Sequence, residues 1–546
     1  MWKDEKFKLL QYKVQSFMKS SVPILRDLLP EGGEFAWCIL TLTRGEWNAR
    51  SRSEKLSILA QHPAVHVIGK DGQWPIMPEV KSWDPEMLGL YLDPFHWRQT
   101  HDMLQQARKD WPNDRIGEMD LVSLYGAMNK PERTSIFNML DIPLLGSRIA
   151  LPVSSVEAGG SLHHSGQREH HWASAVHLEA LMWALVALAG AVSESHMDAS
   201  GFATFVRIVL GEKLWCIAFD CKAKQLKMEA IPDASRGWKD EEMRWQGILL
   251  KEGDDLYMAP GTPHYVFTTK DSLCVGGHFY CKALFSDTLR AITLEHFMGM
   301  SLTNIQHSSS PFLCVKILAS YCEALRYRPD NEHIAKLGDF PTWRELAHLV
   351  TLVANLNNLI SQPAAKPKDD DDEVTEEERI LWESDIWQNN GFTFWADRPK
   401  MLKLIAQLPR LIHEDEFYDA LQEVEDWYFP FVKACGDNVY EDEHRRRFVP
   451  KLLAARLRES RDNNTKITFP PEHAAAVNIE HGKIQKPPRK VAQKPAAKKA
   501  AGKKAAGKKP AKVIVVKPAV ERPQRKGRSA RRESSSDKGE GPSTGN

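Results

Sequence analysis

Two side chains of the kind that bind metals, His196 and Asp198, stand two positions apart in the segment SESHMDASG. Residues i and i+2 of an extended chain point to the same face, so both side chains can reach one metal ion from a strand or its end. A non-haem iron site of two histidines and one carboxylate needs a second histidine and leaves positions open for a co-substrate and dioxygen. His264, which follows a Pro-Gly-Thr-Pro turn, is the candidate for that ligand.

The spacing of His196 and Asp198 alone is a weak signal, because the pattern of a histidine two positions before an acid recurs at His177 and His413. Both repeats lie in segments of helical texture, where residues i and i+2 diverge. An isolated match is most simply a pair of polar surface or core residues. The surroundings of His264 favour a metal ligand, because a Gly-Asp turn, a short strand and the Pro-Gly-Thr-Pro turn fix where this histidine points.

Two further side chains suit an acidic keto-acid co-substrate. Lys213 lies in the segment Gly-Glu-Lys-Leu-Trp, near the start of a predicted strand that follows the metal pair. A lysine in a dry barrel supplies the cation that the distal carboxylate of such a co-substrate needs. Ser193 stands three residues before His196, and its hydroxyl can hydrogen-bond the same carboxylate.

The order of these motifs resembles that of the Jumonji C (JmjC) family, especially JmjC-like proteins of filamentous fungi. The resemblance covers about residues 130–300 and includes a segment, Asn138 to Leu144, that is similar to the one preceding the barrel in that family. The matching motifs are Ser193, the HMDASG segment from His196, the GEKLW segment from Gly211, the PGTPH segment ending at His264, and the GGHFY segment from Gly276.

The resemblance implies a double-stranded β-helix that binds Fe(II) and 2-oxoglutarate. Such an enzyme hydroxylates a C–H bond and releases succinate and CO₂, and on an N-methyl carbon the hydroxylation ends as demethylation. It implies that His196, Asp198 and His264 ligate iron, and that Lys213 and Ser193 contact the co-substrate. One departure is Ser195, which stands where the fungal pattern often has an aromatic residue, beside the charged Glu194.

The fold class that we predict is α+β: a jelly-roll, cupin-like barrel flanked by helices, with a helical C-terminal region. We expect Trp215 and Tyr280 to belong to the core and His278 to be structural. Gly, Asp and Pro separate six short β-rich runs between residues 202 and 280, which suggests a sandwich or barrel. We expect a further strand at residues 35–43 and helices at 85–108, 178–192, 284–327 and 381–457.

Composition shifts divide the chain into six predicted segments. A stretch of prolines and consecutive acids separates two folded parts as a solvated linker. The histidines between residues 163 and 177 lie in a polar loop and show no tetrahedral metal spacing. The segments are an N-terminal α/β region of unknown role (1–130), the barrel (131–300), a helical extension (301–361), the acidic linker (362–378), a helical region (379–470) and a basic tail (481–546).

The tail carries 20 lysines and arginines against 4 acids, although the whole chain has a net charge of +1. Its low hydrophobicity, Pro/Gly content and like charge predict disorder. A tail of this kind binds nucleic-acid phosphates without reading sequence and is typical of nuclear proteins. The alternative is a solubilising tail without a specific partner.

Membrane and secreted classes do not fit this sequence. The longest apolar run, residues 180–192, is shorter than the roughly 20 residues of a membrane-spanning helix. The first residues mix charges with apolar positions, so no secretory signal is expected. The 8 cysteines are scattered without a Cys-x-x-Cys pair, which predicts reduced thiols in an intracellular protein.

Three functions stay open from the sequence. The first is an oxygenase acting on a protein, with a histone lysine demethylase or a protein hydroxylase as subtypes. The second is a catalytically silent chromatin-binding or scaffold protein that keeps the barrel as a binding module. The third is an oxygenase acting on a small molecule or a nucleic acid. The preference for the first depends on family analogy.

Overall fold

The structure is a computed structural model. It describes residues 39–69, 77, 80–103, 116–130, 135–144, 182–218, 245–298, 302–303, 311–326, 340–359, 402–436, 453–467, 476–478 and 483–485. The histidine-rich segment, the acidic linker and the basic tail of the sequence analysis lie outside these residues, and the six segment boundaries stay predictions.

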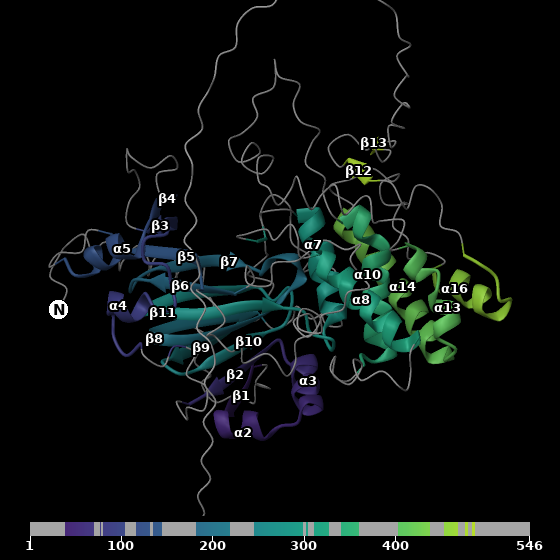
Figure 1. The fold of residues 1–546 in the computed structure, drawn as a ribbon, viewed down its shortest axis with the longest axis horizontal. Helices are drawn as coiled ribbons and strands as arrows, with labels where there is room; N and C mark the ends of the chain where they lie inside the picture. Colours follow the sequence, from purple (N-terminus) through teal and green to yellow (C-terminus); the bar gives the residue numbers. More distant parts are fainter. Residues whose placement is uncertain are drawn as a thin grey trace, which may run out of the picture. The chain divides into compact units, whose positions relative to one another are not determined.

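Among the described residues, one mixed sheet of 11 strands forms most of the β structure, and β12 and β13 form a separate two-stranded sheet (Figure 1). Nine strands follow the order β1-β2-β10-β8-β11-β6-β5-β3-β4, while β7 pairs with β11 and β9 pairs with β8. Only the β1–β2 pair at one end of this order is parallel. The strands are β1 Ile39–Thr43, β2 Ala64–Ile68, β3 Arg98–Asp102, β4 Ile116–Met119, β5 Phe137–Pro143, β6 Met182–Ala187, β7 Val192–His196, β8 Ala203–Ala218, β9 Trp245–Lys251, β10 Asp255–Met258 and β11 His264–Phe279.

Two strands of 16 residues, β8 and β11, pair along almost their whole lengths and give the sheet its shape. The first half of β8 pairs with β10 and the second half with β9. The first half of β11 pairs with β7 and the second half with β6. The halves thus build two four-stranded sets, β6-β11-β8-β10 and β7-β11-β8-β9, which is compatible with the jelly-roll that the sequence predicts.

The six short strands that we expected between residues 202 and 280 are therefore four, because two of the expected breaks bend a strand without ending it. Gly211 has φ +83°, and a Cβ there would lie 2.0 Å from the carbonyl oxygen of Asp271 on the facing strand. The opposite bend of β11 contains register shifts between Thr268 and Cys274. Glycine and bulges let both strands curve while their ladder continues.

The predicted helix at 178–192 is wrong for the residues that the structure describes. Residues 182–187 form β6 between β5 and β11, and β7 begins at Val192 after a turn in which Gly190 has φ +97°. A short apolar run fits a buried strand as well as a buried helix, and pairing on both sides decides for the strand.

The predicted helix at 85–108 is also largely wrong. Only α4 Pro85–Leu88 is helical, whereas Arg98–Asp102 forms β3, which pairs with β4 and β5. These cross-strand bonds override the local helical spacing. Residues 104–108 lie outside the described part of the chain.

The N-terminal strands β1 and β2 lie at one end of the 11-stranded sheet. The strand expected at 35–43 is found as β1, with residues 35–38 undescribed. Helices α2 Arg44–Ala49 and α3 Arg52–Gln61 connect β1 to β2, and each begins with a capping box, Thr43 with Glu46 and Ser51 with Glu54. Asp255 of β10 binds Arg44 and Arg207 in a buried ion cluster that joins this region to β8.

Helical structure is found as expected at Phe285–Met298 and Pro311–Arg326 within 284–327, and the described parts of 402–457 are largely helical as expected. Helix α7 lies between the strands and helices α10 and α14 (Figure 1). The strands and the helices share one hydrophobic core, because Met197, Phe202 and Tyr280 next to the strands pack in one cluster with side chains of the helices. The remaining helices and strands are α5 Leu121–Met128, the 3₁₀ helix η3 Ala199–Gly201, α7 Phe285–Met298, α8 Pro311–Arg326, α10 Trp343–Leu359, α13 Leu408–Leu411, α14 Asp415–Gly436, α16 Leu453–Asp462, β12 Ala476–Asn478 and β13 Lys483–Gln485.

In the described part of the chain, no helix has both the length and the apolar character needed to cross a membrane. The six described cysteines are free thiols and all are buried: Cys216, Cys274, Cys281, Cys314, Cys322 and Cys435.

Candidate metal centre

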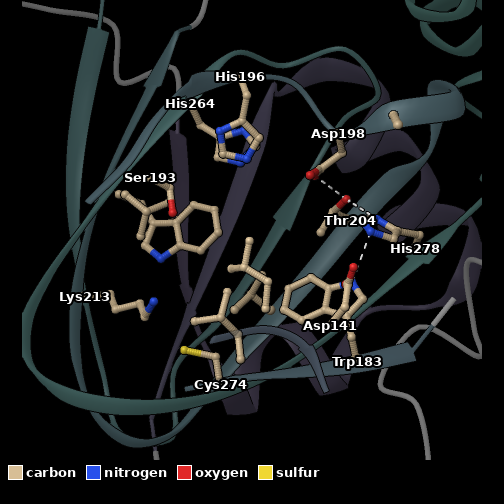
Figure 2. Close-up of a pocket in the computed structure, with 16 residues that line it drawn as sticks. Asp141, Trp183, Ser193, His196, Asp198, Thr204, Lys213, His264, Cys274 and His278 are labelled. Carbon is tan, nitrogen blue, oxygen red and sulfur yellow. Dashed lines mark hydrogen bonds between the residues drawn. The ribbon is translucent and has the colours of Figure 1, made fainter. Parts of the chain in front are cut away.

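The pairing of β7 with β11 brings the two candidate histidines together. His196 is the last residue of β7, His264 is the first of β11, and the two are partners in the strand register. Their ring centroids are 4.3 Å apart. Asp198 follows β7 by two residues and points toward the same space (Figure 2). One ligand atom of each of the three residues lies within 4.8 Å of the others, so this triad can hold a metal ion.

Backbone carbonyls orient both imidazoles. The Nδ1 atom of His196 lies 2.6 Å from the carbonyl oxygen of Glu194, and that of His264 lies 3.0 Å from the carbonyl oxygen of Thr262. A carbonyl only accepts, so each Nδ1 carries the proton and each Nε2 keeps a free lone pair. Burial and the neighbouring His264 lower the pKa of His196 to about 4, so its ring is neutral at physiological pH.

Asp198 supplies the anionic ligand. Burial alone would raise the pKa of its carboxyl, but His264, His278 and His196 and a hydrogen bond from Thr204 outweigh burial and lower it. The Thr204 hydroxyl donates to Asp198 Oδ2 at 2.5 Å. One carboxylate and two neutral imidazoles form a donor set that fits a divalent iron ion with open positions.

Two glycine-containing turns present the ligands, and both press against α7. Gly201, in the 3₁₀ turn after Asp198, has φ +64°, and a Cβ there would lie 2.7 Å from the carbonyl oxygen of Thr288. Gly261, in the turn before His264, has φ +63°, and a Cβ there would lie 2.8 Å from Arg290. Only glycine combines this backbone conformation with so close an approach.

Polar side chains of α7 bind these turns directly. Arg290 donates to the carbonyl oxygens of Pro260 and Gly261 at 3.2 and 3.1 Å. Glu295 accepts from the backbone N–H of Ser200 at 2.6 Å. One helix therefore holds both segments that carry the candidate ligands.

The position of α7 depends in turn on the helical region. Glu345 of α10 accepts a hydrogen bond of 3.0 Å from the N–H of Ser286, in the first turn of α7. Thr293 of α7 and Tyr428 of α14 share a hydrogen bond of 3.1 Å. Helices α10 and α14 thus hold α7 in place, and α7 in turn holds the two turns that carry the candidate ligands.

The other end of the pocket is suited to an anion. Lys213 is 2% exposed and lines the pocket together with Ser193 and Trp215. Burial lowers its pKa, which the nearby Cys274 opposes. Among the described residues, no carboxylate forms an ion pair with Lys213, and the buried indole N–H of Trp215 has no hydrogen-bond partner. Unpaired buried donors are costly, so a bound carboxylate would satisfy both.

Comparison with known proteins gives a distant relationship. No protein-family model matches the chain. Two proteins of Cryptococcus neoformans var. neoformans serotype D, each described as "JmjC domain-containing histone demethylation protein 1", are similar to it. The protein of strain JEC21 / ATCC MYA-565 is 23% identical over 202 residues, covering 34% of this chain and 23% of the relative. The protein of strain B-3501A is 23% identical over 217 residues, covering 34% and 24%.

These matches support a relationship to the JmjC family. They do not single out a member, and the chain spans about a quarter of the length of these curated relatives. The matched share of the chain is comparable to the part over which the sequence motifs resemble the family.

The structure brings together all five predicted site residues in one pocket, His196, Asp198, His264, Lys213 and Ser193. Their roles stay predictions. Of the two weaker His-x-acid patterns, the one at His177 lies outside the described residues, and the one at His413 lies just before and at the start of α14. Within the described part of the chain, the triad is the one cluster of three such side chains that could hold a metal.

Sequence reasoning missed other pocket residues. Thr204, Trp183 and Asp141 line the pocket, and His278, for which we expected a structural role, does so as well. Asp141 lies at a bulge of β5 with φ +49°. Burial raises its pKa to about 6, with Arg98 opposing and Asp198 adding to the shift. The similarity of residues 138–144 to a family segment was the available signal for Asp141, whereas the others depend on strand register.

The two aromatic residues expected in the core differ in their surroundings. Tyr280 is fully buried, and its hydroxyl donates to the carbonyl oxygen of Ser200. Trp215 is buried too, but its ring stacks on His264 with centroids 5.2 Å apart and lines the pocket. Glu194, in contrast, is exposed and contributes its backbone carbonyl to the orientation of His196.

Proposed function

We propose that this protein is an Fe(II)- and 2-oxoglutarate-dependent dioxygenase with a JmjC-type double-stranded β-helix. The observation that carries the proposal is the meeting, in one pocket, of a triad that could hold a metal ion and a buried lysine that has no acid partner among the described residues. A structural histidine cluster would not need the lysine, and a structural lysine would have an acid partner. The distant relationship to the JmjC family supports the same activity.

In this proposal His196, Asp198 and His264 hold Fe(II), and the iron supplies the activation of dioxygen. Lys213 binds the distal carboxylate of 2-oxoglutarate, with the Ser193 hydroxyl as a further donor. Ser193 already receives a hydrogen bond of 3.4 Å from the Asn138 amide, which leaves its own proton available to a ligand. Trp215 covers one side of His264 and helps to exclude water from the centre.

We propose a protein substrate, with a histone as the first candidate, because the similar proteins are described as histone demethylation proteins. The reaction is then N-demethylation or hydroxylation of a side chain. The basic tail, with its 20 lysines and arginines, binds nucleic acid without sequence preference in a nuclear protein.

The test is turnover of 2-oxoglutarate to succinate by the full chain with Fe(II), because such turnover often proceeds without the prime substrate. The matched protein is the double variant His196→Ala/Asp198→Ala, checked for folding by circular dichroism. Turnover that depends on both residues supports the oxygenase. Absence of turnover together with absence of an Fe(II)-dependent thermal shift would contradict it and favour a catalytically silent binding module.

A further inference from the structure

Four side chains form a continuous hydrogen-bonded line that ends on Asp198 (Figure 2). The indole Nε1 of Trp183 lies 3.0 Å from His278 Nε2, and His278 Nδ1 lies 2.9 Å from the Thr204 hydroxyl. Thr204 lies 2.5 Å from Asp198 Oδ2. We call these three residues behind Asp198 the Trp183 relay.

The chemistry of the groups fixes the direction of every bond in the relay. An indole N–H can only donate, so His278 Nε2 must accept. The neutral imidazole then carries its proton on Nδ1, which donates to the Thr204 oxygen. The hydroxyl proton of Thr204 is left to point at Asp198, whose carboxylate can only accept. No other arrangement of protons satisfies all three contacts.

The strand register places the residues of the Trp183 relay next to one another. His278 and Thr204 are register partners on β11 and β8, and Trp183 of β6 lies opposite Gly276 of β11. A Cβ at Gly276 would lie 2.3 Å from the Trp183 ring. Glycine at this position therefore gives the indole the room it needs to lie across β11 and reach His278.

We infer that the Trp183 relay positions Asp198 for metal binding. By occupying Oδ2 it leaves Oδ1 as the oxygen without a Thr204 contact, available to a metal ion, and it fixes the rotation of the carboxylate before a metal arrives. Thr204, His278 and Trp183 are positioning residues in this scheme, since each acts through Asp198. The inference rests on the metal-binding part of the proposed function.

Hydrogen-bond partners behind a metal ligand typically change metal affinity by about 10- to 100-fold when they are removed. We expect Thr204→Val to weaken metal binding by about this factor, because valine has the same branched shape as threonine but lacks the hydroxyl that donates to Asp198. Thr204→Ser keeps the hydroxyl and should bind within about threefold of the original protein. His278→Phe and Trp183→Phe should weaken binding progressively less with distance from Asp198.

The experiment is titration of the metal-free full chain with Co(II), read by the visible absorption of the bound ion, which also reports its coordination geometry. Thr351→Val is the matched control, because it removes a buried threonine hydroxyl from α10 that has no hydrogen-bond partner among the described residues. Weaker binding and an altered Co(II) spectrum in Thr204→Val, with both restored in Thr204→Ser, support the relay.

The other outcomes separate the relay from the proposed function. Equal Co(II) affinity and spectra in Thr204→Val and the original protein would overturn the relay while the metal site stands. Failure of the original protein to bind Co(II) would overturn both. If Thr204→Val does not fold, His278→Phe and Trp183→Phe decide: unchanged Co(II) binding in both overturns the relay, and graded weakening supports it.

Discussion

The two ends of the pocket differ in how fully their polar groups are satisfied. At the metal end, each candidate ligand has a hydrogen-bond partner: Glu194 for His196, Thr262 for His264 and Thr204 for Asp198. At the opposite end, the buried ammonium of Lys213 has no acid partner within the described part of the chain. The metal end is organised before its ligand arrives, whereas the lysine end is completed by its ligand.

The largest expected effect is at the metal end. Asp198→Ala removes the anionic ligand and should abolish detectable Co(II) binding and 2-oxoglutarate turnover, because two neutral imidazoles alone hold a divalent ion weakly. Both are measured on the full chain by absorption and by succinate release. His413→Ala, in an exposed pattern of the same spacing, is the control and should change neither. Co(II) binding that survives in Asp198→Ala would remove this residue from the centre.

The next effect separates the two ends. Lys213→Met should weaken 2-oxoglutarate binding by about 10- to 100-fold, the range of a charge-assisted hydrogen bond, and leave Co(II) affinity unchanged. Isothermal titration of the Co(II)-loaded protein with 2-oxoglutarate measures the affinity for 2-oxoglutarate. The control is Lys270→Met, which removes an exposed lysine that pairs with Glu212. Equal loss of both affinities would show that the ends are not independent.

Lys213 also makes a prediction about pH. Burial lowers its pKa from 10.5 in the folded protein, so the unfolded chain binds this proton more tightly. The free energy of unfolding should therefore gain a contribution that rises with pH between the lowered pKa and 10.5. Urea unfolding at several pH values, compared with Lys213→Met, isolates this contribution. A difference between the two proteins that stays constant with pH would contradict it.

A smaller effect is expected where α7 supports the metal end. Arg290→Met removes the hydrogen bonds to the carbonyl oxygens of Pro260 and Gly261 and should weaken Co(II) binding by up to about tenfold. Arg344→Met on α10 is the control, because that half-exposed arginine pairs with Glu423 at the surface. Unchanged affinity in a folded Arg290→Met protein would mean that the turn keeps its conformation without the helix.

The smallest effect concerns Ser193 at the lysine end. Ser193→Ala should weaken 2-oxoglutarate binding by less than Lys213→Met does, because the serine hydroxyl is an uncharged donor to the carboxylate whereas the lysine brings a full positive charge. Isothermal titration of the Co(II)-loaded Ser193→Ala and Lys213→Met proteins with 2-oxoglutarate compares the loss of affinity that each substitution causes. A loss as large as that of Lys213→Met would show that the serine, and not the charge, determines binding at this end.

How far the sequence predicted the site depended on whether the signal was local. The spacing of His196 and Asp198 and the turn before His264 are local, and the structure places these residues together. The Trp183 relay joins residues of three strands, and a strand register is invisible without knowing which strands pair. For the same reason the run at 180–192 was assigned to a helix, although β5 and β11 make its described part a strand.

The pairing of β8 with β11 also has a consequence for folding. His264 meets His196 and Ile217 across long stretches of intervening chain, so loop closure must precede any contact between the ligands. A partly folded chain that has not paired β11 has no site to offer an ion. Metal in excess would then stabilise only the fully folded state, and the melting temperature should rise with the concentration of free metal.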